Sequence, residues 1–248
     1  MIEINNLTKS FGKNLIWEDV NFQINDGETI AIIGRSGCGK SVLLKHINAL
    51  LSPDSGSVVI DGDNIHDMDY VSQRKLRQKF GILFQGSALF DSINTFENIA
   101  FPLRFFTNQG EEEIRDNVME ALKLVNLESA HDKETSELSG GMRKRVGLAR
   151  AIILQPKYIM YDEPTSGLDP QTSNEINELI IRMADSFDVT SIVVTHDMHS
   201  VLNIADKVAF LDEQKLSWHG TIDDLTKSEQ GSLKSFITAS EYQINSTR

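Results

Sequence analysis

The sequence has almost no cysteine, no long apolar run and a deficit of positive charge. Its single cysteine, Cys38, excludes an internal disulfide and fits a reducing compartment. No apolar run is long enough to cross a bilayer, and the start Met1–Ile4 lacks the basic-then-apolar signal region of a secreted protein. We therefore expect the chain to be cytosolic, so that any membrane role comes through a partner.

The charge balance bears on the kind of partner. Asp and Glu number 36 against 24 Lys and Arg, which gives a formal net charge of −12 at pH 7. This balance argues against nucleic acid as the main partner, because binding its backbone normally needs a basic face. An acidic surface that keeps the protein soluble explains the charge. With 40% hydrophobic and 24% charged residues, the 248-residue chain has the composition of a soluble globular protein, folded as one large domain or two small lobes.

Apolar runs bounded by turn residues predict an α/β fold. Met1–Gln23 has the pattern of short strands with turns, and Thr29–Ile33 is a short, fully apolar run typical of a central parallel strand covered on both faces. A helix is predicted over Lys40–Leu51. Further strands are predicted at Gly81–Phe84, Tyr158–Tyr161 and Thr190–Val194, with a hairpin within Val208–Trp218.

Helical patterns dominate between Ser87 and Leu154. Glu111–Glu113 open a helix at the end where its dipole favours negative charge. Beyond this segment, a further helix is predicted between the strands at 158–161 and 190–194, with Asp169 as its cap and Pro170 in its first turn. The sequence shows no repeat, low-complexity tract or long linker. The layout predicts an α/β nucleotide-binding core interrupted by a helical subdomain.

The segment Gly34–Ser41 fits the pattern G-x-x-x-x-G-K-[ST] between a predicted strand and a predicted helix. Its glycines allow backbone N–H groups to face phosphates, and the helix N-terminus adds positive potential. Lys40 is expected to reach the β- and γ-phosphates of ATP, and the Ser41 hydroxyl to bind Mg²⁺. The alternative, a chance glycine-rich turn, fits less well with the strand and helix on either side. The cofactor-binding residues predicted here are Gly34, Ser36, Gly37, Cys38, Gly39, Lys40, Ser41 and Val42.

An acidic pair, Asp162 and Glu163, ends the apolar strand predicted at 158–161. A carboxylate in this place can hold a metal through water, and its neighbour can orient or deprotonate an attacking water. Such a pair alone is more often a loop or cap feature. The following segment Pro164–Asp169 makes the pattern much more specific.

Together these motifs resemble the ATP-binding subunits of ABC transporters, over a stretch from about Ile2 to Thr226. The resemblance implies an α/β fold, that of a P-loop NTPase ABC nucleotide-binding domain with an antiparallel β subdomain and an inserted helical subdomain. We expect the ATPase domain over residues 1–231, its helical subdomain at about 87–154, and a C-terminal helix or tail over 232–248. The apolar residues suggesting that helix are Leu233, Phe236 and Ile237. The motifs that carry the resemblance are Gly34–Ser41, Gln85, Leu138–Met142, Tyr158–Glu163, Ser166–Asp169 and His196.

The resemblance implies roles for particular side chains. Gln85 resembles the glutamine that touches Mg²⁺ and the attacking water and that begins the loop sensing the transmembrane partner. Asp162 resembles the metal-binding aspartate, and Glu163 the catalytic glutamate. His196 resembles the switch histidine that contacts the γ-phosphate. Phe11 matches the aromatic position that stacks on adenine, and an ordinary core Phe at the end of a strand is the alternative.

The segment Leu138–Met142 resembles the signature that completes the phosphate site of an opposing subunit. Small residues at a helix start, here Ser139, Gly140 and Gly141, expose N–H groups and a hydroxyl to an anion. Asp169 belongs to the loop that crosses the dimer interface in this family, and we count it with the cofactor-binding residues. We therefore expect ATP to join two copies head to tail, and hydrolysis to release them.

Two further features of the sequence are interpreted as having no role in catalysis. The basic run Arg143–Arg145 after the signature is interpreted as a solvated helix face rather than a catalytic group. Cys38 fills a variable position of the phosphate loop and is interpreted as tolerated rather than reactive.

Single substitutions and longer stretches of sequence indicate which group of ABC ATPases the chain resembles most. Met142 stands where the signature commonly has Gln, and Val42 where Thr is common, so a hydroxyl near the α-phosphate is lost. The stretches that resemble the ATPases of the Mla (maintenance of lipid asymmetry) phospholipid transporters and related MCE-domain systems are Gly39–Lys45, Leu83–Asp91, Asn98–Leu103 and Leu138–Val146. In that family the segment after the glutamine lines a groove for a coupling helix of the permease. The apolar residues predicted for this groove, with ordinary core as the alternative, are Phe84, Leu89, Phe90 and Phe101.

The resemblance thus implies an ATP-hydrolysing motor subunit of a bacterial ABC transporter that moves phospholipids between the inner and outer membranes. It would lie on the cytoplasmic face of the inner membrane, use ATP and Mg²⁺, and act with a second copy and an integral membrane permease. The resemblance also implies an MCE-domain protein and allows for a small STAS-domain regulator. Two alternatives stay open: the ATPase of another importer, such as one for amino acids, and a soluble ABC protein acting on nucleic acid or ribosomes. Against the latter, residues 85–138 hold no long coiled coil and the chain carries one cassette.

Overall fold

The computed structural model describes residues 1–245, with side chains described as far as residue 240. It divides into two compact units, residues 1–77 with 190–245, and residues 78–189. Residues 246–248 of the expected C-terminal tail lie outside the described residues.

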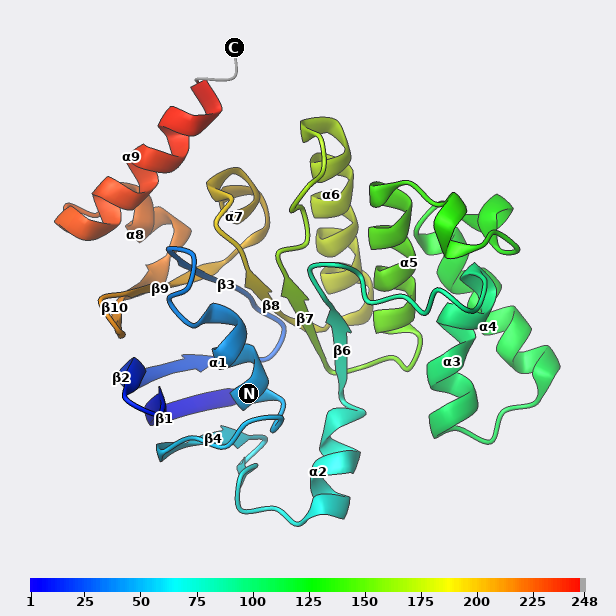
Figure 1. Cartoon of the computed structure of the whole chain (residues 1–248), viewed down its shortest axis with the longest axis horizontal. Helices are drawn as coiled ribbons and strands as arrows, with labels where there is room; N and C mark the ends of the chain where they lie inside the picture. The colour runs from blue at the N-terminus through cyan, green and yellow to red at the C-terminus, as the bar shows by residue number, and fades with distance from the viewer. Residues whose placement is uncertain (246–248) are drawn as a thin grey trace. The chain divides into compact units, whose positions relative to one another are not determined.

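The first unit contains an antiparallel sheet, as expected, in the order β2-β1-β4-β5. The two long strands β1 (Ile2–Phe11) and β2 (Asn14–Ile24) pair antiparallel, with Ile2 opposite Ile24, and lie side by side in Figure 1. Strand β4 (Ser55–Ile60) pairs with the other side of β1, and β5 (Asp63–Asn64) pairs with β4. Buried and exposed residues alternate along the last part of β2, from Val20 to Ile24, as expected in a sheet with one buried face.

The same unit contains a second group of strands around β3 (Thr29–Gly34). All six residues of β3 are buried, because β8 (Thr190–Val194) and β9 (Lys207–Asp212) flank it, both parallel to it. Strand β10 (Lys215–Thr221) returns antiparallel to β9, which confirms the predicted hairpin. Its turn residues Glu213 and Gln214 both have positive φ, as a twisted two-residue hairpin turn requires.

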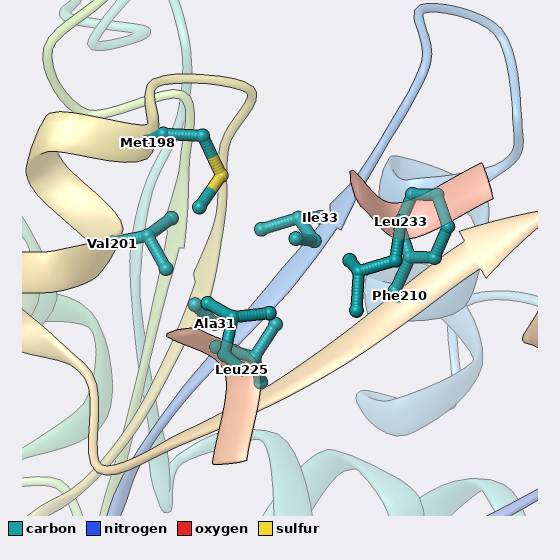
Figure 2. Close-up of a cluster of buried hydrophobic side chains, with 8 residues drawn as sticks. Ala31, Ile33, Met198, Val201, Phe210, Leu225 and Leu233 are labelled. Carbon is teal, nitrogen blue, oxygen red and sulfur yellow. The ribbon is translucent and has the colours of Figure 1, made fainter. Parts of the chain in front are cut away.

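The helices of this unit are α1 (Lys40–Ile47), α2 (Tyr70–Arg77), α7 (Met198–Ile204), α8 (Ile222–Lys227) and α9 (Gly231–Asn245). Helix α1 ends four residues before the predicted Leu51, because Asn48 leaves the helical conformation and Ala49 has a φ of 56°. Figure 2 shows Met198 and Val201 of α7 directed toward Ala31 and Ile33 of β3. Val208, Phe210, Leu225 and Leu233 complete this cluster. Leu225 belongs to α8 and Leu233 to α9, so both helices are held to the unit by apolar packing.

The second unit contains two parallel strands, β6 (Phe80–Leu83) and β7 (Tyr158–Asp162), and most of the helices in the middle of the chain. Helices α3 (Thr95–Phe106), α4 (Glu111–Leu124) and α5 (Gly140–Ile152) are grouped together in Figure 1. Short 3-10 helices lie at Glu128–Ala130 and Thr135–Glu137. Helix α6 (Pro170–Phe187) packs against α5 and has the predicted Asp169 cap and a proline in its first turn.

Candidate functional site

The predicted site residues fall into two sets, one in each unit. In the first unit, β3 leads directly into the glycine-rich loop. Its last residue, Gly34, lies opposite Leu211 of β9 and has a φ of 152°. A Cβ at Gly34 would lie 2.4 Å from the Leu211 carbonyl oxygen, so only glycine lets the loop leave the sheet at this point. The predicted strand–loop–helix order is confirmed.

The loop closes around its lysine. Lys40 is only 8% exposed, and its Nζ donates hydrogen bonds to the carbonyl oxygens of Gly34 at 2.8 Å and Arg35 at 3.2 Å. Gly39, in the left-handed region at φ 95°, precedes α1 and has no side chain to cap the first turn. A held ammonium group beside uncapped helical N–H groups makes a strong site for a phosphate.

The remaining residues of the loop differ in exposure. Ser36, Gly37 and Ser41 are exposed, whereas Cys38 and Val42 are half-buried. Burial raises the pKa of the Cys38 thiol, because removal from water disfavours the thiolate. A thiol held in its protonated form agrees with the interpretation of Cys38 as unreactive.

His196 lies at the same edge of the sheet as this loop. Strands β3 and β8 are parallel, with Ile32 opposite Val194, so the residues after both strands emerge at one edge. His196 is exposed there, and the next residue, Asp197, caps α7 by accepting a 3.0 Å hydrogen bond from the His199 N–H. The structure therefore brings His196 and the phosphate loop together within one unit.

Phe11 ends β1 with its ring accessible. The side chain is 48% exposed, so the alternative of a core phenylalanine is wrong. Lys9 Nζ lies 5.4 Å from the ring centre and also donates to Asp54 Oδ1 at 2.9 Å. An exposed ring is what stacking on a nucleotide base requires. The contact with adenine stays a prediction.

In the second unit, two neighbouring parallel strands gather the acidic and amide side chains. Leu83 lies opposite Tyr161, so Gln85 after β6 and Asp162 at the end of β7 emerge at one edge. Gln85 Nε2 lies 3.5 Å from the Ser166 hydroxyl oxygen. Carboxylate and amide oxygens are hard donors of the kind Mg²⁺ takes.

Glu163 has an unusual backbone conformation. Its φ is 49°, in the left-handed region that non-glycine residues seldom adopt. Such conformations cost about 1–3 kcal/mol and cluster at functional sites. The Glu163 carbonyl oxygen accepts a 3.2 Å hydrogen bond from the Ser166 N–H, which helps to hold the turn.

The signature segment and the loop ending at Asp169 are neighbours in this unit. Ser139 caps α5, with its Oγ accepting a 3.2 Å hydrogen bond from the Met142 N–H. A Cβ at Gly141 would lie 2.5 Å from Thr172 Cγ2 of α6, so any larger residue there would force the Thr172 side chain to shift. Asp169 accepts hydrogen bonds from the Thr172 hydroxyl at 2.6 Å and N–H at 3.0 Å, and these lower its pKa.

The interpretation of the basic run after the signature as a solvated helix face holds for the exposed Arg143 and is wrong for Lys144. Its side chain is buried, with Nζ donating to the carbonyl oxygens of Gln85 at 2.6 Å and Glu163 at 2.9 Å. Burial lowers the pKa of Lys144 to about 8, although the carboxylates of Asp162 and Glu163 act in the opposite direction. Arg145 pairs with Glu175 of α6. The helical pattern gave no signal for this burial, since Lys144 has basic neighbours on both sides.

An aromatic surface lies on the same unit. We call Phe90, Phe101, Phe105 and Phe106 the aromatic patch, since their rings form a continuous series of contacts with centres 4.8–5.9 Å apart. All four are exposed, by 39–57%, so the core alternative for Phe90 and Phe101 is wrong. Phe84 is exposed as well, and Leu89 is half-buried. Phe105 and Phe106 were not predicted to belong to this surface. The signal in the sequence was their position next to the charged Arg104, at the end of an apolar helix.

None of the helices in the part of the chain that the structure describes is long and apolar enough to span a bilayer.

The sequence profile of the ABC transporter family matches residues 17–166, which is more than half of the chain. This chain therefore belongs to the ABC transporter family, as an ATP-binding cassette with the α/β fold of a P-loop ABC domain.

Relatives of this chain carry different transport names. It is 44% identical to the probable ribonucleotide transport ATP-binding protein mkl of Mycobacterium tuberculosis, over 95% of this chain and 66% of that protein, just under two thirds of its length. It is 41% identical to the intermembrane phospholipid transport system ATP-binding protein MlaF of Haemophilus influenzae, over 96% of this chain and 90% of that protein. The methionine import ATP-binding protein MetN of Clostridium tetani is 39% identical over 99% of this chain and 77% of its own length.

A solved structure agrees with the fold. The ATP-binding cassette MJ0796, in a dimeric post-hydrolysis state bound to ADP and phosphate, superimposes with a TM-score of 0.82. The sequences are 32% identical, and the match covers 90% of this chain and 99% of that one.

Proposed function

We propose that this chain binds ATP with Mg²⁺ and hydrolyses ATP as the motor subunit of an ABC transporter. The observation that carries the proposal is the loop Gly34–Ser41, folded around the buried ammonium group of Lys40 at the uncapped start of α1. Backbone N–H groups and a fixed positive charge bind a triphosphate. In this proposal Gly34, Ser36, Gly37, Cys38, Gly39, Lys40, Ser41 and Val42 contact the nucleotide, and the exposed ring of Phe11 stacks on its base.

The catalytic roles are proposed from the family resemblance and from the chemistry of the residues that follow the strands. Glu163 orients and deprotonates the attacking water, Gln85 contacts that water, and His196 contacts the γ-phosphate. The oxygen donors of Ser41, Gln85 and Asp162 are a hydroxyl, an amide and a carboxylate, and this set fits Mg²⁺. When bound, the ion would neutralise charge on the phosphate oxygens.

A second copy of the chain is the proposed partner at the signature. Ser139, Gly140 and Gly141 are at the start of α5, where helical N–H groups can bind an anion, and Asp169 caps the neighbouring helix α6. Support comes from MJ0796, a cassette of the same fold solved as a dimer. ATP would then join two copies head to tail.

The substitution Glu163→Gln tests this assignment. We expect ATP hydrolysis to fall about 100-fold or more, because a general base is lost, with ATP affinity retained. The ATP-bound dimer should accumulate and be detected by light scattering after size exclusion. Glu112→Gln, an exposed carboxylate on α4, is the matched control and should hydrolyse ATP normally.

Two results would contradict the proposal at different levels. A Glu163→Gln chain with full turnover removes Glu163 from the catalytic role. An unmodified chain that binds no ATP overturns the function as a whole.

The transported substance is proposed to be phospholipid, moved between the inner and outer membranes of a Gram-negative envelope. The support is the likeness to Mla-type ATPases in four stretches and the 41% identity to the Haemophilus influenzae phospholipid-transport protein over 90% of its length. Import of an amino acid is the second candidate, because the methionine-import protein of Clostridium tetani is 39% identical.

The aromatic patch is the proposed docking surface for the permease, on the cytoplasmic face of the inner membrane. Four exposed phenylalanine rings in contact with one another are unusual on a surface without a partner. An MCE-domain protein and a small STAS-domain protein are proposed as further members of the assembly.

Purification of the tagged chain from its own cells in mild detergent, with identification of bound proteins by mass spectrometry, separates the candidates. A permease together with an MCE-domain protein supports phospholipid transport. A permease with an amino-acid-binding protein supports the second candidate. Recovery of ribosomes or DNA without membrane proteins would overturn the transporter assignment.

A further inference from the structure

Helix α5 places one buried cation between two loops of the second unit. Lys144 lies in the second turn of α5 and is only 4% exposed. Lysine is almost never buried to this extent unless its ammonium group has partners. Its partners here are two backbone carbonyl oxygens that belong to different loops, those of Gln85 and Glu163.

These two loops follow adjacent parallel strands. Gln85 comes two residues after β6, and Glu163 comes directly after β7. The Nζ–O distances of 2.6 Å and 2.9 Å are those of charge-assisted hydrogen bonds. One ammonium group therefore fixes the orientation of the peptide groups that follow both residues.

The carbonyl of Glu163 lies in a turn that needs support. The residue has left-handed backbone geometry, which the rest of the structure must stabilise. Its carbonyl oxygen has two donors, the Ser166 N–H at 3.2 Å and Lys144 Nζ. The Cα of Glu163 lies in the same peptide plane as this carbonyl, so a shift of that plane would displace Cα and with it the Glu163 side chain.

A second cation of α5, Arg150, already attaches the loop after β6 to this helix, so Lys144 is not required for that attachment. Arg150 donates hydrogen bonds to the carbonyl oxygens of Ser87 at 2.7 Å and Ala88 at 2.8 Å. This contact holds the later part of the loop to α5. Lys144 is the cation of α5 whose hydrogen bonds join the Gln85 and Glu163 loops to each other.

We propose that Lys144 is a positioning residue, whose buried ammonium group holds the backbone of Gln85 and Glu163 so that both side chains keep the arrangement needed for hydrolysis. The inference rests on the catalytic roles proposed above for those two residues. It assigns no contact with nucleotide to Lys144 itself. A misplacement of about 1 Å in a catalytic group can reduce a rate 100-fold, so the loss of this bridge should act on turnover rather than on binding.

The test compares Lys144→Met, which keeps the length of the side chain without donors, with Lys144→Arg, which keeps charge and donors. For the full chain, we expect Lys144→Met to lower kcat for ATP hydrolysis at least about tenfold, with KM and the Kd for ATP changed by less than about twofold. Lys144→Arg should recover most of the rate. Lys123→Met, at an exposed position on α4, is the control and should match the unmodified chain.

Hydrogen–deuterium exchange gives a second measurement that does not depend on hydrolysis. In Lys144→Met, but not in Lys144→Arg, the peptides covering residues 85–88 and 163–166 should both exchange faster. Faster exchange at both peptides supports the bridge even if the unmodified chain hydrolyses no ATP, an outcome that would count against the proposed function alone.

Three outcomes would overturn the inference. The first is a Lys144→Met chain with unchanged kcat. The second is unchanged exchange at both peptides. The third is that Lys144→Met and Lys144→Arg lose ATP affinity and thermal stability to the same extent, which would make Lys144 a structural residue without a positioning role.

Discussion

Acidification should destabilise the first unit through two neighbouring histidines, the buried His46 and the half-buried His66. His46 lies on α1 and has no exposed surface, and its Nδ1 is the donor to the Val42 carbonyl oxygen at 2.8 Å, since a carbonyl only accepts. Its ring packs edge-on against Trp17, with ring centres 5.2 Å apart, and lies 6.2 Å from His66. Within the described residues, Nε2 of both histidines is buried without a hydrogen-bond partner. A second proton would put a positive charge on a ring that is largely removed from water.

The magnitude follows from the pKa of His66. Burial, reinforced by the nearby His46, lowers this pKa from 6.5 to about 4. A folded-state pKa below the unfolded value means that the unfolded chain binds the proton first, so stability is lost as the pH falls from about 6.5 to about 4. The interval of about 2.5 pH units, at 1.36 kcal/mol each, sets an upper limit of about 3 kcal/mol when complete, and of about 2 kcal/mol by pH 5, because solvent screens the half-buried ring. Burial lowers the pKa of His46 too, which adds to the loss in the same direction.

Urea unfolding of the unmodified chain and of His66→Gln at pH 8 and pH 5 measures this effect. The free energy of unfolding of the unmodified chain should fall by about 1–2 kcal/mol more than that of the variant between the two pH values. His199→Gln, an exposed histidine on α7, is the control and should keep the full pH dependence. If His66→Gln loses as much stability as the unmodified chain, His66 does not cause the pH dependence and the explanation is wrong.

Two substitutions test the proposed partners. Ser139→Arg should abolish the ATP-dependent dimer and ATP hydrolysis while ATP still binds, because the signature could then no longer receive a phosphate. The variant also loses the helix cap of α5, which is worth about 1 kcal/mol of stability. Ser139→Asn, which can still cap α5, is the control for this loss. Loss of ATP binding with the dimer intact would show that the signature does not act across two copies. Phe105→Ser, at the most exposed ring of the aromatic patch, should reduce permease recovery in detergent at least about fivefold, with ATP affinity unchanged, because exposed aromatic anchors dominate interfaces. Equal permease recovery from Phe105→Ser and from Phe187→Ser, an exposed phenylalanine outside the patch, would argue against docking there.

Local sequence determined the elements that depend on near neighbours. The apolar run of β3, the glycines and the lysine that follow it, and the Asp169–Pro170 start of α6 each indicated their conformation, because short-range hydrogen bonds and backbone sterics decide it. The same local chemistry carried the resemblance that the family match confirmed.

Only the tertiary structure decided which polar and aromatic side chains are buried. Lys144 has the sequence environment of an exposed helical lysine, yet its two acceptors lie 59 and 19 residues away along the chain. The rings of the aromatic patch have the composition of a core but remain exposed, because no element among the described residues covers them. Gly141 has a reason that sequence did not show, the approach of Thr172 from α6. Burial depends on which distant segments pack together, and a pattern of near neighbours does not contain that information.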